Sequence, residues 1–156
     1  MFFNLKDRAL LKISGRDSES FLQGQFSNDI NKLDTLSIQL NAYCQHQGKI
    51  LALFWVTKYE DSFFLSFPAD LLEAIKSRLQ MFIIMSDVVI EDITKDYIQV
   101  GSIDEVHQNV LVINDKLSLI IADKRDINKF TMEPIEHWNK ACIDSSLPEI
   151  FSVTSE

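Results

Sequence analysis

Residues 8–30 decide the fold, and they read R-A-L-L-K-I-S-G-R-D-S-E-S-F-L-Q-G-Q-F-S-N-D-I. The segment Arg8–Ser14 is mostly apolar and stops at Gly15, which is typical of a buried strand. Asp17 or Ser18 can cap a following helix, because their side chains accept hydrogen bonds from its free amides. Apolar residues then recur at helical spacing at Phe21, Leu22, Phe26 and Ile30. The stretch predicts a strand followed by a helix.

Residues 36–94 add further strands and a second helix to this strand and helix. Leu36–Ala42 alternates, with Leu36, Ile38, Leu40 and Ala42 predicted on the buried face of a strand. Ile50–Lys58 is almost continuously apolar and predicts a central strand, and Phe63–Phe67 predicts its hairpin partner. A helix is expected from Ala69 to about Phe82, with an apolar stripe of Leu71, Leu72, Ile75, Leu79 and Phe82. With a strand at Val88–Thr94, the order is that of a ferredoxin-like split βαβ unit with one extra strand.

The rest of the chain predicts a second group of elements. Strands are expected at Tyr97–Val100, Val110–Ile113 and Leu117–Ala122, the last two forming a hairpin. A final helix begins near Pro134, and one of its faces carries Ile135, Trp138, Ala141 and Cys142. The predicted fold class is α+β, with a first unit at residues 1–94 and a second segment at residues 95–156.

Composition limits the classes of function. The 156 residues are 46% apolar and 24% charged, which suffices for a hydrophobic core. The net charge of −8 and the lack of a Lys/Arg cluster argue against a nucleic-acid platform. The apolar run Ile50–Val56 is far shorter than the roughly 20 residues that span a bilayer. The N-terminus lacks signal-peptide features, so we expect a cytoplasmic protein without a membrane segment, and its two cysteines reduced.

Searches for catalytic and metal-binding motifs give no candidate. Phosphate-binding glycine loops and a G-x-S-x-G nucleophile turn do not occur in the sequence. Cys44-Gln45-His46 offers two soft ligands, but no second pair follows at zinc-site spacing. We therefore predict neither a catalytic residue nor a metal ligand. Trp138 is either a core residue or the wall of a ligand site, and spacing alone leaves this open.

Taken together, these segments resemble the YgfZ/GcvT-related folate-binding family. The family opens with a strand, G-x-D and F-L-Q-G-Q-x-[ST]-N-D-[VI], which matches residues 8–30 in order. The resemblance continues at Gln47-Gly48-Lys49-Ile50-Leu51, at Pro68-Ala69-Asp70-Leu71 and from Trp138 to Pro148-Glu149-Ile150. It covers essentially the whole chain and implies a ferredoxin-like unit within a GcvT/YgfZ-type folate-binding fold.

The resemblance also implies a function. It implies tetrahydrofolate as cofactor and a role in iron–sulfur cluster assembly or repair, linked to tRNA modification, with iron–sulfur assembly or client proteins as partners. Trp138 is expected to contact the folate, and Arg8 falls where a second aromatic residue of the site is expected. An arginine there can stack on the pterin or pair with a folate carboxylate. Further polar contacts are expected from Gln25, Asn28, Asp29 and Gln47, although Asn28 and Asp29 also suit simple caps and turns.

Two departures from the family pattern shape the expectation. Where aminomethyltransferases of this family carry an essential aspartate, this chain has Ala52 and Leu53, so aminomethyl transfer is not expected. The C-terminal barrel and the K-G-C-Y-x-G-Q-E motif of the YgfZ branch would follow beyond Glu156, so the chain resembles the N-terminal part of that branch. Two alternatives remain: a ligand-free interaction module of the same fold, and a glycine-cleavage-type one-carbon transferase.

Overall fold

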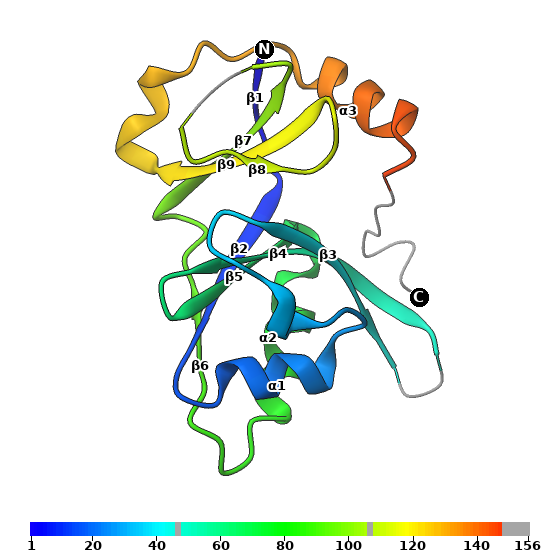
Figure 1. Cartoon of the computed structure of the whole chain (residues 1–156), viewed down its shortest axis with the longest axis vertical. Helices are drawn as coiled ribbons and strands as arrows, with labels where there is room; N and C mark the ends of the chain where they lie inside the picture. Colours follow the sequence, from blue (N-terminus) through cyan, green and yellow to red (C-terminus); the bar gives the residue numbers. More distant parts are fainter. Residues whose placement is uncertain (46–47, 106–107, 148–156) are drawn as a thin grey trace.

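A computed structural model describes residues 1–45, 48–105 and 108–147 of the chain. They form two antiparallel sheets, one of five strands and one of four. Figure 1 shows the five-stranded sheet in the middle, with the helices α1 (Ser18–Gln25) and α2 (Leu72–Met81) on one face and the four-stranded sheet on the other. Within the described ranges, no helix is long and apolar enough to cross a membrane.

The five-stranded sheet confirms the predicted ferredoxin-like unit. Its strand order is β3-β4-β5-β2-β6, and every neighbouring pair is antiparallel. Consequently β2 and β4 run parallel with β5 between them, and β5 and β6 run parallel with β2 between them, as in two interleaved split βαβ units. The extra strand β3 lies at the edge. The strands are β2 (Arg8–Ser14), β3 (Ile38–Cys44), β4 (Ile50–Tyr59), β5 (Ser62–Pro68) and β6 (Val89–Asp92).

The four-stranded sheet has the order β1-β7-β9-β8 and contains the predicted hairpin. Its strands are β1 (Phe2–Asn4), β7 (Tyr97–Ile103), β8 (Leu111–Val112) and β9 (Leu117–Asp123). The sequence analysis did not predict β1, which pairs with β7 through Phe3 and Gly101. Thus the first residues of the chain belong to the second sheet. The helix α3 (Ile135–Asp144) packs Trp138, Ile135, Ala141 and Cys142 against this sheet, as predicted.

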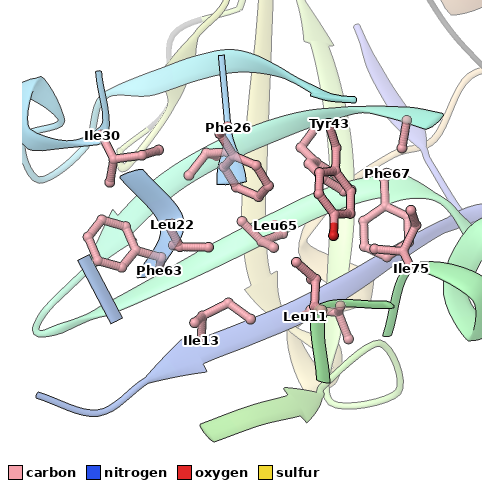
Figure 2. Close-up of a cluster of buried hydrophobic side chains, with 14 of the residues drawn as sticks. Leu11, Ile13, Leu22, Phe26, Ile30, Tyr43, Phe63, Leu65, Phe67 and Ile75 are labelled. Carbon is pink, nitrogen blue, oxygen red and sulfur yellow. The ribbon is translucent and has the colours of Figure 1, made fainter. Parts of the chain in front are cut away.

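The main core lies between the five-stranded sheet and its two helices. Phe21 and Leu22 from α1, and Ile75 and Leu79 from α2, pack on apolar side chains of the central strands. Figure 2 shows Leu22 and Ile75 facing the strand residues Leu11 and Leu65. The 3₁₀ turn Ala69–Leu71 precedes α2, and a second one follows α1 at Ile30–Lys32. The predicted stripe on α2 holds for Leu71, Ile75 and Leu79, which are buried, whereas Phe82 lies beyond the helix and is 45% exposed.

The predicted buried face of β3 is wrong. The buried residues of β3 are Asn41 and Tyr43, which lie on the opposite face. Ile38 packs instead on the apolar cluster around Trp138, and Leu36 precedes the strand. The alternation failed because the sheet is covered on both faces, so polarity no longer marks solvent. Asn41 is buried with hydrogen bonds, accepting from the Asn28 amide (2.8 Å) and donating to the Gln39 side chain (2.8 Å).

Candidate functional site

A cavity of about 470 Å³ lies between the two sheets. One side is formed by the connection from β1 to β2 (residues 4–8), by Trp55 on β4 and by Pro68 at the end of β5. The other side is formed by Leu119 on β9 and by one face of α3, including Trp138 and Cys142. Most of the lining is apolar, with a few polar groups at Asn4, Lys6, Asp7, Arg8 and Asn139. This composition is typical of sites for small organic ligands.

Trp138 forms one wall of this cavity and is held rigidly. Its side chain is 8% exposed, and its ring centroid lies 5.9 Å from that of Phe3. The indole also lies directly over Gly101 of β7, where an added Cβ would come within 2.7 Å of Trp138 Cε3. The glycine therefore makes the close approach of α3 to the sheet possible. Both roles that the sequence left open therefore apply: Trp138 is a core residue, and it is also a wall of the cavity.

Arg8 lies in the same cavity and is anchored by Ser66. The Arg8 Nε donates to Ser66 Oγ (2.8 Å) and Nη2 donates to the Ser66 carbonyl (2.9 Å). The Ser66 hydroxyl donates in turn to the side chain of Gln99, whose Nε2 donates to the Ala9 carbonyl (3.1 Å). Gln99 is on β7 and Ser66 on β5, so this network joins the two sheets and fixes the guanidinium at the edge of the cavity.

Trp55 is a lining residue that the sequence analysis missed. Ala52, Phe54 and Val56 of β4 fill the main core, so strand alternation places Trp55 on the opposite face, toward the second sheet. The continuous apolar run around it concealed this alternation. The continuous apolar run could have indicated the position of Trp55, because a strand that is apolar on both faces is buried on both faces. Half of its side chains must then point away from the helices. The chain has two tryptophans, and both line this cavity.

The other candidates of the sequence analysis lie elsewhere. Gln25 is at the end of α1, and neither it nor Asn28 and Asp29 lines the cavity. Asn28 donates from its side chain to the Leu40 carbonyl, and Asp29 Oδ1 accepts from the Asn31 amide (3.1 Å) at the start of a 3₁₀ turn. The Asp29 contact is a cap, and the Asn28 contact joins the segment after α1 to β3. The assignment of the three residues to a ligand stays a prediction. Gln47 lies outside the described residues.

The described residues contain no cluster of the kind that holds a metal ion. Over residues 1–45, 48–105 and 108–147, no three His, Cys, Asp or Glu side chains are placed to hold a metal ion. Cys44 is exposed, and Cys142 is half-buried at the cavity. Ala52 is fully buried in the main core, and Leu53 is half-buried on the opposite face of β4.

Comparisons with known proteins agree with the fold and the sequence resemblance. No family model matches the chain. An uncharacterized protein of Haemophilus influenzae is 28% identical over 96% of this chain and 54% of its own length. The tRNA-modifying protein YgfZ of Vibrio atlanticus is 26% identical over 96% of this chain and 48% of its own length. In sequence, the chain is related to proteins named YgfZ.

The structural comparison gives the fold of this YgfZ/GcvT-related chain. The glycine cleavage system aminomethyltransferase T of Bartonella henselae matches with a TM-score of 0.65 and 11% identity, over 96% of this chain and 47% of that one. The GcvT-type fold is thereby confirmed. This chain spans about half the length of the relatives it matches, at 54% and 48% for the two curated proteins.

Proposed function

We propose that the chain binds tetrahydrofolate in the cavity between its two sheets. The observation that carries the proposal is that Trp138 and Arg8, 130 residues apart and both expected at a folate site, line the same cavity. The cavity volume of about 470 Å³ lies within the usual range of ligand sites, about 300–1,000 Å³. Folate combines flat aromatic rings with carboxylates, and the lining combines indoles with a guanidinium.

The proposed contacts follow from the geometry of the lining. Trp138 and Trp55 offer aromatic faces from opposite sides of the cavity, and an aromatic ring stacks on such faces in offset or edge-on arrangements. Arg8 offers a planar cation whose position Ser66 fixes, which suits either a folate carboxylate or the edge of the pterin. Trp55 would supply the second aromatic wall that Arg8 does not.

We propose no aminomethyl transfer by this chain. A carboxylate is needed on β4 to orient or protonate a folate nitrogen, and Ala52 and Leu53 offer none. Binding tetrahydrofolate without this group fits a role in iron–sulfur cluster assembly or repair linked to tRNA modification, in the cytoplasm, with iron–sulfur assembly or client proteins as partners. That role is supported by the relationship to proteins named tRNA-modifying protein YgfZ.

Tryptophan fluorescence tests the binding directly, because both tryptophans line the cavity. Anaerobic titration with tetrahydrofolate should quench emission saturably in the wild type and in the single-tryptophan variants Trp55→Phe and Trp138→Phe. Trp138→Ala should weaken binding by roughly 2- to 12-fold or more, since aromatic stacking contributes about 0.5–1.5 kcal/mol in addition to the buried area. N-acetyltryptophanamide in the same titration corrects for absorption by the folate.

The outcomes separate the competing functions. A wild type without saturable quenching, or a Trp138→Ala variant with unchanged affinity in calorimetry, would contradict the proposal. Absence of folate binding together with stable capture of an iron–sulfur carrier protein would select the interaction module. Formation of methylenetetrahydrofolate from an aminomethyl donor would select the one-carbon transferase.

A further inference from the structure

A second groove, of about 380 Å³, lies on the opposite side of the five-stranded sheet. Its walls are Leu51 of β4 and residues at the start and along one face of α2: Leu71, Ala74, Ile75, Ser77, Arg78 and Met81. Most of these side chains are apolar, Ser77 adds a hydroxyl, and Arg78 contributes a positive charge. The groove shares no lining residue with the cavity that contains Trp138.

A β-bulge opens the sheet edge of this groove. Tyr43 of β3 pairs with Ala52, and the next residue, Cys44, pairs with Ile50. Leu51 is therefore left without a partner in β3, although strand alternation alone would direct it to the other face. Bulges re-aim single side chains and are frequent beside binding sites. Here the re-aimed side chain lines the groove.

Arg78 is the charged group of the groove, and its Nε lacks an acceptor among the described residues. Its guanidinium carbon lies 5.9 Å from the ring centroid of Tyr43 and 5.6 Å from that of Phe82, so two aromatic rings hold it in place. Its Nε is buried and makes no hydrogen bond within the part of the chain that the structure describes. The ion pairs between described residues do not include Arg78 either.

Such a group favours an anionic ligand. Arginine stays protonated at every accessible pH, and a buried donor without an acceptor is unfavourable until one is supplied. A carboxylate matches the planar fork of the guanidinium and can accept two parallel hydrogen bonds. The apolar walls and the 61% exposed Met81 beside them suit an aliphatic chain attached to that carboxylate.

We propose that this groove binds a small aliphatic carboxylate, whose acid group pairs with Arg78 and whose chain packs between Leu51 and α2. The volume of about 380 Å³ is at the lower end of the range of ligand sites, which favours a short chain. The proposal does not depend on folate binding, because the two sites have different residues and lie on different faces of the sheet.

An NMR titration with sodium octanoate tests the site. Amide shifts of the ¹⁵N-labelled chain should change saturably at Leu51, Ile75 and Met81, and much less at Trp55 and Trp138. Arg78→Gln should weaken octanoate binding at least tenfold. Arg16→Gln is the matched control, because the Arg16 side chain is 83% exposed and does not line the groove. The octanoate affinity of this variant should equal that of the wild type.

A neutral analogue separates charge from apolar packing without any substitution. Octan-1-ol should bind at least tenfold more weakly than octanoate to the wild type, which keeps the test valid if Arg78→Gln fails to fold. Octanoate without saturable shifts at the groove, octan-1-ol binding as tightly, or a folded Arg78→Gln variant with unchanged affinity would each overturn the proposal. Tetrahydrofolate added at saturation should leave the octanoate shifts in place.

Discussion

At the scale of single residues, Trp138 shows how a core position can also serve a site. One face of its indole lies on Gly101 and near Phe3, and the side chain also borders the cavity. Packing on the sheet removes the rotamer freedom that a ligand would otherwise have to restrict on binding. Because of these contacts, a substitution at Gly101 or Phe3 should also move the Trp138 indole at the cavity.

Gly101→Ala tests this sensitivity. The added Cβ would lie 2.7 Å from Trp138 Cε3, well inside contact distance, so the indole or the strand must shift. Overpacking of this kind costs about 1–3 kcal/mol, and we expect that loss of unfolding free energy in urea denaturation. We also expect weaker tetrahydrofolate binding, because the displaced indole no longer forms the same wall.

Gly24→Ala is the matched control for that substitution. Gly24 is exposed on α1, and an added Cβ there meets no heavy atom within 4 Å. Alanine favours the helix by roughly 0.5–1 kcal/mol over glycine, so this variant should be more stable than the wild type. A Gly101→Ala protein as stable as the wild type would show that α3 does not press on β7 as described.

At the scale of elements, the 3₁₀ helix Lys124–Lys129 begins with a strong local cap. Asp123 Oδ1 accepts from the Arg125 amide, and the Arg125 side chain donates to both Asp123 oxygens, each at 2.9 Å. Hydrogen bonds from the Arg125 side chain lower the pKa of Asp123 from 3.8 to about 2. The carboxylate is therefore favoured in the folded chain, and its contribution to stability is present above pH 3.8 and disappears as the pH falls toward 2.

Carboxyl ¹³C shifts of Asp123 across this pH range check the expectation. The midpoint should lie near pH 2 in the wild type and rise toward 3.8 in Arg125→Gln, which removes the positive charge and the two guanidinium donors. Lys129→Gln, which breaks the neighbouring pair with Asp126, should leave the Asp123 midpoint in place. An Asp123 midpoint that Arg125→Gln does not move would contradict the cap.

The elements that the sequence predicts well are those whose signals are local. Arg8–Ser14 was predicted with the same bounds as β2, since an apolar run ended by Gly15 leaves few alternatives. Gly15 has a φ of +109°, and an added Cβ would lie 2.2 Å from the Asp87 carbonyl, so the stop is enforced by backbone and space together. In contrast, β1 is three residues long and pairs with β7, almost a hundred residues away, so its own sequence carries no sufficient signal.

Residues of the candidate site also divide into those with a signal in the sequence and those that depend on long-range packing. Trp138 and Arg8 came from the family resemblance, and the structure places both at one cavity. Trp55 required knowledge of which face of β4 meets the helices, and Gln99 required the packing of one sheet on the other. Gln25, Asn28 and Asp29 match the family motif, and Arg8 departs from it, yet Arg8 lines the cavity and the other three do not. Motif membership alone does not separate ligand contacts from structural ones.

At the scale of the whole molecule, the cavity exists because two sheets are held at a fixed separation. Leu10 and Phe64 of the five-stranded sheet pack with Ile93, Tyr97 and Ile121 to form an apolar contact between the sheets. Beside it, Gln99 accepts from Ser66 and donates to the Ala9 carbonyl, and it is 5% exposed. The apolar contact supplies attraction without direction, whereas the hydrogen bonds allow one relative position of the sheets.

Gln99→Met tests whether this network sets the geometry of the cavity. Methionine preserves the approximate size but leaves the Ala9 carbonyl and the Ser66 hydroxyl without their partner, at a cost of about 1–3 kcal/mol. We expect that loss in urea denaturation, and a lower tetrahydrofolate affinity because Ser66 also anchors Arg8. Gln80→Met, at an exposed position of α2, is the control and should change neither quantity.

A double-mutant cycle with Ser66→Ala then separates the network from simple packing. Each single variant breaks the same Ser66–Gln99 hydrogen bond. The double variant should therefore lose less unfolding free energy than the two single variants lose together. Residues in one hydrogen-bond network usually couple by about 0.5–3 kcal/mol, so we expect a difference of at least about 0.5 kcal/mol. Additive losses would mean that the two side chains act independently. In that case the apolar contact alone would fix the sheets, and Arg8 would keep its place at the cavity in the Gln99→Met protein, with tetrahydrofolate affinity unchanged.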